Sequence, residues 1–192
     1  MNDNELIRSR VDASIKVKTG LLSDEKLLKT IGAVTEEILK CYQQKGKVLF
    51  CGNGGSAADA QHLAAELSGR FYTDRDPLYA EALHVNSSYI TAVANDYSYA
   101  DIYSRAVKGQ GAKGDVLVAI STSGNSENIV RAIAQANEIG MITVGMTGSG
   151  GGKMKNLCTY LINVPSTDTP RIQECHILIG HIICEMVEKK MF

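Results

Sequence analysis

The chain has 192 residues, of which 44% are hydrophobic and 21% charged, and its formal net charge is -1. This composition is typical of one soluble globular domain with a substantial core. The small net charge predicts neither a nucleic-acid nor a membrane partner. The sequence contains no signal-peptide core and no apolar stretch near the roughly 20 residues of a membrane span, which predicts a cytoplasmic protein. Its five cysteines are scattered without a C-x-x-C pair and are expected to be reduced thiols.

The predicted elements begin with two helices, over residues 3–19 and 23–45, and Ser23 is the expected N-cap of the second. After Gly46 the pattern changes to short apolar runs bounded by turn residues. Five such runs are strand candidates: "KVLFCG", "EALHVN", "DVLVAIS", "MITVGMTG" and "TYLINVP".

Helices are predicted between most of these strands, over 56–71, 99–110 and 126–139. Short apolar strands that alternate with helices predict an α/β fold, with a five-stranded parallel sheet covered on both faces. We expect one domain over 1–192, with an N-terminal helical layer over 1–45 and the α/β core over 46–192.

The last predicted helix, roughly 169–190, has too wide an apolar surface for a one-sided surface helix. This surface is expected to pack partly against another subunit or to be covered inside the monomer. It comprises Ile172, Ile177, Leu178, Ile182, Ile183, Met186 and Val187.

Two turns that follow predicted strands have the form of anion-binding loops. In "GNGGS", Gly54 and Gly55 permit positive φ angles and Ser56 can cap the next helix. In "STSGNS", four hydroxyl side chains surround Gly124 and Asn125, an arrangement that suits a phosphate dianion beside a helix N-terminus. Either loop alone can be an ordinary tight turn. Both loops at the ends of neighbouring parallel strands indicate binding.

Nucleotide-binding motifs fit this sequence less well. The nearest stretch to the G-x-x-x-x-G-K-[S/T] pattern is "TGSGGGKM", which has Thr147 at the first glycine position and Met154 after the lysine. Gly52, Gly54 and Ala57 satisfy the looser dinucleotide pattern, but the next strand ends "LHVNSS" without the acidic residue that would hold a ribose. Neither a nucleoside triphosphatase nor a dinucleotide site is expected.

Two ionisable residues follow the first loop on the same predicted helix. His62 and Glu66 are four residues apart, which places their Cβ atoms on one face about 5 to 6 Å from each other. An exposed polar pair is the alternative, but the adjacent loop favours a reactive site.

The last helix adds Gln173, His176 and His181. His181 lies in the apolar stretch "ILIGHIICEM", where a core histidine is the alternative. Eight helical residues rise about 12 Å, so Gln173 and His181 meet at one point only if their side chains converge or if one belongs to a neighbouring subunit.

Four blocks of the sequence, in order and spacing, resemble the sugar isomerase (SIS) superfamily, and within it the sedoheptulose 7-phosphate isomerases, also called phosphoheptose isomerases. The blocks are "CGNGGSAADAQHLAAELSGRF", "AVANDYSYADIYSR", "GDVLVAISTSGNSENIVRAI" and "RIQECHILIGHIICEMVE". The resemblance spans nearly the whole chain. It implies an SIS-type three-layer fold, a homotetramer with interfacial active sites, and the first step of ADP-heptose synthesis for lipopolysaccharide or a related surface polysaccharide.

The resemblance also implies roles for individual residues. Glu66 and His181 match the acid/base pair, and one zinc ion per subunit is implied with the ligands His62, Glu66, Gln173 and His181. The implied substrate-binding positions are Asn53, Gly54, Gly55, Ser56, Glu66, Asn95, Asp96, Ser121, Thr122, Ser123, Ser126 and Gln173.

Aldose–ketose isomerisation requires such a set of residues. A base removes a proton from C1, an acid protonates C2, and the enediolate between them needs stabilisation. By resemblance Glu66 is the base and His181 the acid, although the residues alone allow the roles to be exchanged. Nitrogen and oxygen ligands suit zinc, which can polarise the carbonyl or be partly structural.

Two alternatives remain open from the sequence. A non-catalytic SIS paralogue that binds a replication initiator protein shares the "RIQE" block but lacks equivalents of Glu66 and His181. Isomerisation of another sugar phosphate, such as a pentose or hexulose phosphate, is the second. One departure from the family pattern is Pro170, where some relatives carry an acidic side chain, so a polar contact from that position is in doubt.

Overall fold

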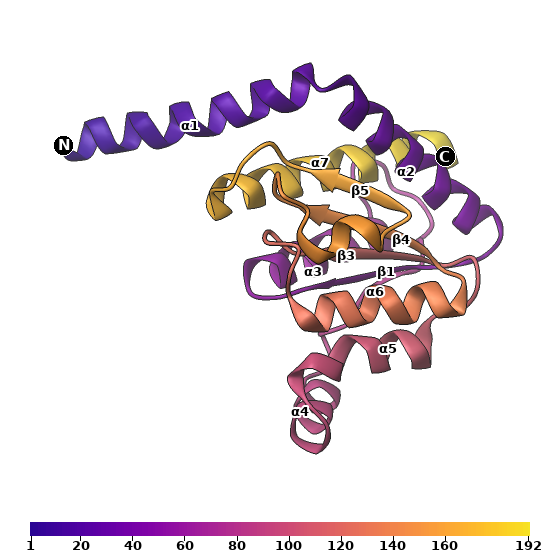
Figure 1. Cartoon of the computed structure of the whole chain (residues 1–192). Coiled ribbons are helices and arrows are strands. Elements are labelled where there is room, and N and C mark those ends of the chain that lie inside the picture. Colours follow the sequence, from indigo (N-terminus) through magenta and orange to yellow (C-terminus); the bar gives the residue numbers. More distant parts are fainter.

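The core of the fold is a parallel sheet of five strands in the order β2-β1-β3-β4-β5. The computed structural model describes residues 1–192 and confirms the predicted α/β class (Figure 1). Each of the five predicted runs contains a strand, although "EALHVN" does so only in its first two residues, because β2 ends at Ala82. The strands are β1 Val48–Gly52, β2 Ala80–Ala82, β3 Val116–Ile120, β4 Ile142–Thr147 and β5 Tyr160–Asn163.

Alternate strand residues face two separate cores. Val48 and Phe50 belong to a core of 30 buried residues on the face covered by α2 Glu25–Gln43, α3 Gly55–Ser68 and α7 Thr169–Met191. Leu49 and Cys51 belong to a core of 16 on the face covered by α4 Ser87–Asp96, α5 Ile102–Gln110 and α6 Glu127–Ile139. Burial on both faces explains why β1 and β3 are continuous apolar runs.

Several predicted helix boundaries were wrong for local reasons. Asp24, not Ser23, caps α2, because its carboxylate accepts the Leu27 N–H at 3.0 Å while α1 continues through Ser23. The helix predicted over 99–110 is a 3₁₀ turn, η1 Tyr99–Asp101, followed by α5. The prediction missed α4, a short helix in which Val93 is buried and Tyr89, Ile90 and Ala94 pack partly buried against the smaller core. A second 3₁₀ turn, η2 Gly152–Asn156, follows β4.

The strand register aligns the ends of the central strands. Gly52 pairs with Ile120, and Ile120 pairs with Met146, so these strands finish at one level. The "GNGGS" and "STSGNS" loops leave β1 and β3 at this carboxyl edge, where parallel α/β sheets bind their ligands.

Helix α1, Asp3–Ser23, runs out beyond the sheet (Figure 1). It begins at a capping box formed by Asn2 and Glu5, and its only buried residue is Leu21. Polar contacts join it to α7, where the Ser14 hydroxyl donates to Glu174 at 2.6 Å. None of the helices in the chain combines the length and apolar character needed to cross a membrane.

Candidate active site

Helices α3 and α7 pack in close contact at Gly180. A Cβ atom added at Gly180 would lie only 2.5 Å from both methyl carbons of Leu63. Glycine therefore lets the two helices approach closely, as small residues do at tight helix crossings. The residues next to this contact, His62 on α3 and His181 on α7, are brought together by it.

Three side chains converge beside this crossing. The Nε2 atoms of His62 and His181 are 2.9 Å apart, and His62 Nε2 lies 3.2 Å from Glu66 Oε1. One donor atom from each of these residues lies within 4.8 Å of the others, as in a metal-binding group. Two imidazoles and a carboxylate are the ligands that zinc takes in many catalytic sites, so the residues present fit this metal. His62 and Glu66 are confirmed as neighbours on one helix face, and His181 of the same chain joins them.

The surroundings of this cluster are mixed in polarity. The Phe71 ring lies 5.7 Å, centroid to centroid, from the His181 ring. Asp59, one turn before His62 on α3, has a buried carboxylate oxygen with no hydrogen-bond partner. Burial raises the pKa of Asp59, and the nearby His62 acts in the opposite direction. Sequence analysis missed Asp59, although the spacing of three residues from His62 places both on one face.

The core histidine of α7 is His176 rather than His181. His176 is fully buried, and its Nε2 lies 3.2 Å from the carbonyl oxygen of Thr147, to which it donates. Its Nδ1 has no partner. Burial lowers the pKa of His176 to about 4, so the ring is neutral at pH 7.

Gln173 lies over the start of α3. A Cβ atom at Gly55 would be 2.5 Å from Gln173 Nε2, so only glycine leaves room for this amide. Gly54 is the N-cap with φ 56°, and no side chain caps α3, which corrects the expectation for Ser56. The first loop therefore presents an uncapped helix N-terminus beneath Gln173.

The Asn53 side chain is held within the protein. Its amide exchanges two hydrogen bonds of 2.9 Å with the amide of Asn128, and the Tyr99 hydroxyl donates to Asn53 Oδ1 at 3.0 Å. The Tyr103 hydroxyl donates to the Gly52 carbonyl just before the loop. Sequence analysis missed Asn128, Tyr99 and Tyr103 because no motif marks a residue that supports a loop from another element.

The serine-rich loop is rigidly packed. Ser121 and Ser126 have hydroxyl oxygens 3.1 Å apart, and Ser126 is the N-cap of α6 without a side-chain capping bond. Gly124, with φ 66°, lies against the turn after β4, where an added Cβ would be 2.2 Å from the Gly151 carbonyl oxygen. The predicted hydroxyls and an uncapped helix N-terminus thus lie together.

A hydroxyl-rich pocket of about 260 Å³ adjoins this loop. Thr122 and Ser123 form one side of it. The other side comes from the segments after β4 and β5, which the sequence analysis did not include. The pocket is lined there by Gly148, Ser149, Gly150, Ser166, Thr167, Thr169 and Ile172.

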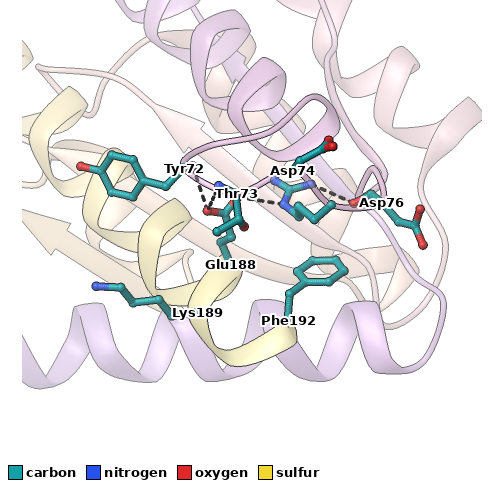
Figure 2. A pocket seen from close by; sticks show the side chains of 8 residues that line it. Tyr72, Thr73, Asp74, Asp76, Glu188, Lys189 and Phe192 are labelled. Atoms are coloured by element: carbon teal, nitrogen blue, oxygen red, sulfur yellow. Dashed lines mark hydrogen bonds and ion pairs between the residues drawn. The ribbon is translucent and has the colours of Figure 1, made fainter.

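Two more predicted binding residues are on α4. Asn95 and Asp96 are exposed at the end of α4, and the Asn95 amide donates to Asp96 at 2.9 Å. Neither residue makes a side-chain hydrogen bond to either loop. A pocket of about 800 Å³ lies between the segment after α3 and the end of α7 and contains no predicted site residue (Figure 2).

Glycine-rich and serine-rich loops at one edge of a parallel sheet, with ionisable residues on adjoining helices, are typical of phosphosugar-binding α/β proteins. A model of the SIS domain matches residues 20–148. The chain belongs to the SIS domain family.

The resemblance to the phosphoheptose isomerases is also confirmed. The chain is 51% identical to a phosphoheptose isomerase of Aneurinibacillus thermoaerophilus, over 98% of this chain and 96% of that protein. It is 50% identical to one of Clostridium acetobutylicum, over 97% and 95%. The structure of phosphoheptose isomerase from Neisseria gonorrhoeae superposes with a TM-score of 0.92 at 40% identity, covering 98% of this chain and all of that one.

Proposed function

We propose that this protein is a phosphoheptose isomerase that interconverts D-sedoheptulose 7-phosphate and D-glycero-D-manno-heptose 7-phosphate. The observation that carries the proposal is the meeting of Glu66, His62 and His181 beside the α3–α7 crossing, in a chain whose relatives at about half identity carry that name. The product would supply ADP-heptose synthesis for a surface polysaccharide, and the cytoplasm is the location expected from the sequence.

In the proposed reaction, Glu66 removes the proton from C1 of the ketose and His181 protonates C2. Glu66 is partly exposed, as a base that meets a substrate must be. The Nε2 atoms of His181 and His62 are within hydrogen-bond distance, so the tautomer of the His181 ring depends on that of the His62 ring. The developing enediolate would lie between these groups, and Asn53 to Gly55 would orient the sugar chain.

We propose that the phosphate binds the serine-rich loop. Ser121, Thr122, Ser123 and Ser126 supply hydroxyl donors, and the N-terminus of α6 adds backbone donors and its dipole. The packing of Gly124 against Gly151 holds the loop in place before the ligand arrives, which reduces the ordering cost of binding.

We propose that His62, Glu66 and His181 hold a zinc ion, with Gln173 as a fourth ligand. Zinc would polarise the substrate carbonyl oxygen and lower the energy of the enediolate. Gln173 of the same chain lies over Gly55, seven residues before His62 and so about 10 Å from it along α3, which favours a fourth ligand from a neighbouring subunit. A carboxylate bound to zinc is a weaker base, so Glu66 would serve as base when the metal contact is loose.

We propose a homotetramer in which neighbouring subunits contribute to each site. Helix α1 exposes Ile7 (59%), Val11 (54%) and Ile15 (57%), which are spaced four residues apart and form one apolar stripe. Leu178 and Ile182 on α7 are also more than a third exposed. Asn95 and Asp96 are exposed and bonded only to each other, which supports a role in the site of an adjacent subunit.

The experiment is turnover of sedoheptulose 7-phosphate by purified protein and by the variants Glu66→Gln and His181→Gln. Each substitution is expected to lower kcat by about 10² to 10⁴-fold, because a proton-transfer group is lost while the shape is kept. Glu138→Gln is the matched control, since Glu138 is exposed near the end of α6 and its side chain bonds only to Gln135.

Near wild-type turnover in either site variant would contradict the acid/base assignment. If a pentose or hexulose phosphate turns over faster than the heptulose, the substrate assignment is wrong and the acid/base assignment is unaffected. A tetramer that turns over none of these sugars would favour the non-catalytic alternative.

A further inference from the structure

The carboxylate of Glu188, near the end of α7, accepts four hydrogen bonds. Oε1 accepts the backbone N–H groups of Tyr72 at 2.8 Å and Thr73 at 2.9 Å, and Oε2 accepts the Phe71 N–H and Arg75 Nε, each at 3.0 Å. Figure 2 shows Glu188 directed at the segment that follows α3. The side chains of Glu188 and Arg75 are only 5% and 2% exposed. The pair is a buried and fully hydrogen-bonded ion pair.

The other edge of the Arg75 guanidinium caps the end of α3. Nη2 donates to the carbonyl oxygen of Glu66 at 2.9 Å, and Nη1 donates to that of Leu67 at 2.9 Å. These carbonyls belong to the last turn of the helix, where they lack N–H partners within the helix and carry the negative end of its dipole. The Leu67 carbonyl also accepts the Leu78 N–H at 3.1 Å. Arg75 therefore joins the C-terminus of α3 to Glu188 on α7.

This pair connects the two helices that carry the candidate metal ligands. Glu66 is itself one of the ligands, and its backbone carbonyl is held by Arg75. Glu188 is seven residues after His181, so both lie on the same face of α7 two turns apart. Phe71, whose N–H is bound by Glu188, places its ring against the ring of His181.

Helices α3 and α7 share the larger core, and the contact of Gly180 with Leu63 sets how closely they approach. The Arg75–Glu188 pair adds a polar connection between their C-terminal ends, beyond Glu66 and His181. Apolar packing tolerates small rotations and shifts that hydrogen bonds of fixed geometry oppose, so this connection limits the relative orientation of the two helices. The distance from His181 to His62 and Glu66 depends on both the apolar contact and this connection.

We propose that Arg75 and Glu188 are positioning residues that hold His62, Glu66 and His181 at metal-binding distance. Neither residue would touch the substrate. The pair acts through the backbone of α3 and through the Phe71 ring, and its effect on turnover rests on the proposed isomerase function. Its effect on metal affinity and on the histidine geometry is independent of that function.

The ionised state of Glu188 agrees with this role. Burial alone would raise the pKa of Glu188, but the N–H groups of Thr73, Tyr72 and Phe71, together with Arg75, outweigh it and lower the pKa to about 2. The carboxylate thus keeps its charge and all four hydrogen bonds throughout the neutral range.

The chain contains a matched control pair at the amino ends of β1 and β3. Asp115, which precedes β3, accepts Lys47 Nζ at 2.6 Å and two backbone N–H groups, those of Lys47 at 3.0 Å and Ala112 at 2.8 Å. It is also a buried carboxylate with a cationic partner, but it contacts neither α3 nor α7. The variants Glu188→Gln and Asp115→Asn therefore both weaken a buried ion pair, and only the first would disturb the histidines.

The experiment measures zinc affinity, kcat, KM and the urea midpoint for the two variants and the wild type. In Glu188→Gln the amide NH₂ faces donors and one acceptor oxygen is lost, so we expect zinc affinity and kcat to fall about 10 to 100-fold, as for other residues that orient ligands, with KM unchanged. Asp115→Asn is expected to lower the urea midpoint and leave zinc affinity unchanged.

Arg75→Lys is a second variant in case Glu188→Gln does not fold. Lysine keeps the charge opposite Glu188 but lacks the planar fork that reaches both the carboxylate and the α3 carbonyls, so zinc affinity is again expected to fall. If zinc affinity stays at the wild-type value in both folded variants while the urea midpoint falls, the pair stabilises the fold without orienting the ligands, and the proposal is overturned.

Imidazole ¹H–¹⁵N spectra of the metal-free proteins separate this proposal from the proposed function. The short contact between His62 and His181 gives these rings resonances that are expected to shift in Glu188→Gln and not in Asp115→Asn. If the histidine resonances shift only in Glu188→Gln and the wild type does not isomerise the heptulose, the proposed function alone is contradicted. Identical histidine spectra in both variants and the wild type would contradict the positioning role alone.

Discussion

Substitution of Gly180 by alanine tests the packing that brings His62 and His181 together. The added Cβ would lie 2.5 Å from both methyl carbons of Leu63, where carbon atoms in ordinary contact are about 3.5 Å apart. Leu63 is only 2% exposed, and the cavity that it and Gly180 both line has a volume of only about 20 Å³. The helices must therefore separate by about 1 Å, or Leu63 must leave its preferred rotamer.

Two opposing effects set the magnitude of this change. Alanine in a helix interior is favoured over glycine by about 1 kcal/mol. Overpacking a well-filled core costs about 1 to 3 kcal/mol. Gly180→Ala should therefore lower the free energy of unfolding by about 0 to 2 kcal/mol. Alanine substitution of an unobstructed glycine in a helix should instead raise the free energy of unfolding by about 1 kcal/mol.

Gly32 supplies the unobstructed comparison. It lies inside α2, and an added Cβ there would have no atom within 4 Å outside its own helix. Urea unfolding of Gly32→Ala and Gly180→Ala at one fixed protein concentration isolates the packing cost as the difference between the two variants. The zinc affinity of Gly180→Ala is expected to fall, whereas that of Gly32→Ala should not change.

Equal stabilisation of the two alanine variants would refute the reasoning. It would mean that Leu63 can move at no cost and that the close approach of α3 and α7 does not depend on glycine. If Gly180→Ala is destabilised but its zinc affinity is unchanged, then separation of the helices does not alter the geometry of the metal-binding residues.

Two further predictions concern pH and metal. The pKa of His176 is about 4 in the folded chain and 6.5 when unperturbed, so the unfolded chain binds more protons between these values, and stability should fall by about 2 kcal/mol from about pH 7 to about pH 5. Urea unfolding of His176→Gln, which can still donate to Thr147, should show a flatter pH profile, and an unchanged profile would contradict the assignment. Removal of metal by a chelator should abolish turnover and lower the Tm, and zinc should restore both in the wild type but not in His62→Ala. Full activity of verified metal-free protein would rule out zinc as an essential Lewis acid.

The sequence predicted the strands well because β1 and β3 are buried on both faces and leave an unmistakable apolar signal. It failed for α4, because the apolar residues from Tyr89 to Ala94 cover less than two helical turns, too short a run for the period to stand out. It also misplaced the start of α2, because Ser23 and Asp24 are both good caps and only the path of α1 decides between them.

The site was predictable where chemistry is local. His62 and Glu66 are neighbours through helix geometry alone, and both loops carry their donors within a few residues. The support from distant elements was not predictable: Asn128 holds Asn53 from a helix that begins 74 residues later, and no spacing rule connects them. His181 was singled out only by the family resemblance, because both His181 and His176 lie in apolar surroundings and only the fold shows which one faces α3.

Helix α1 has a consequence for how the molecule can be observed. Its 21 residues bury only Leu21, and its ties to the rest of the chain are few. In an isolated chain its amide protons should exchange with solvent through fraying alone, long before those of the sheet, which exchange only on global unfolding. In the proposed tetramer the stripe of Ile7, Val11 and Ile15 would be covered, and the same amides would become slow. Hydrogen exchange along α1 would then report subunit association, and exchange along β3 would report folding, in a single experiment on the same sample.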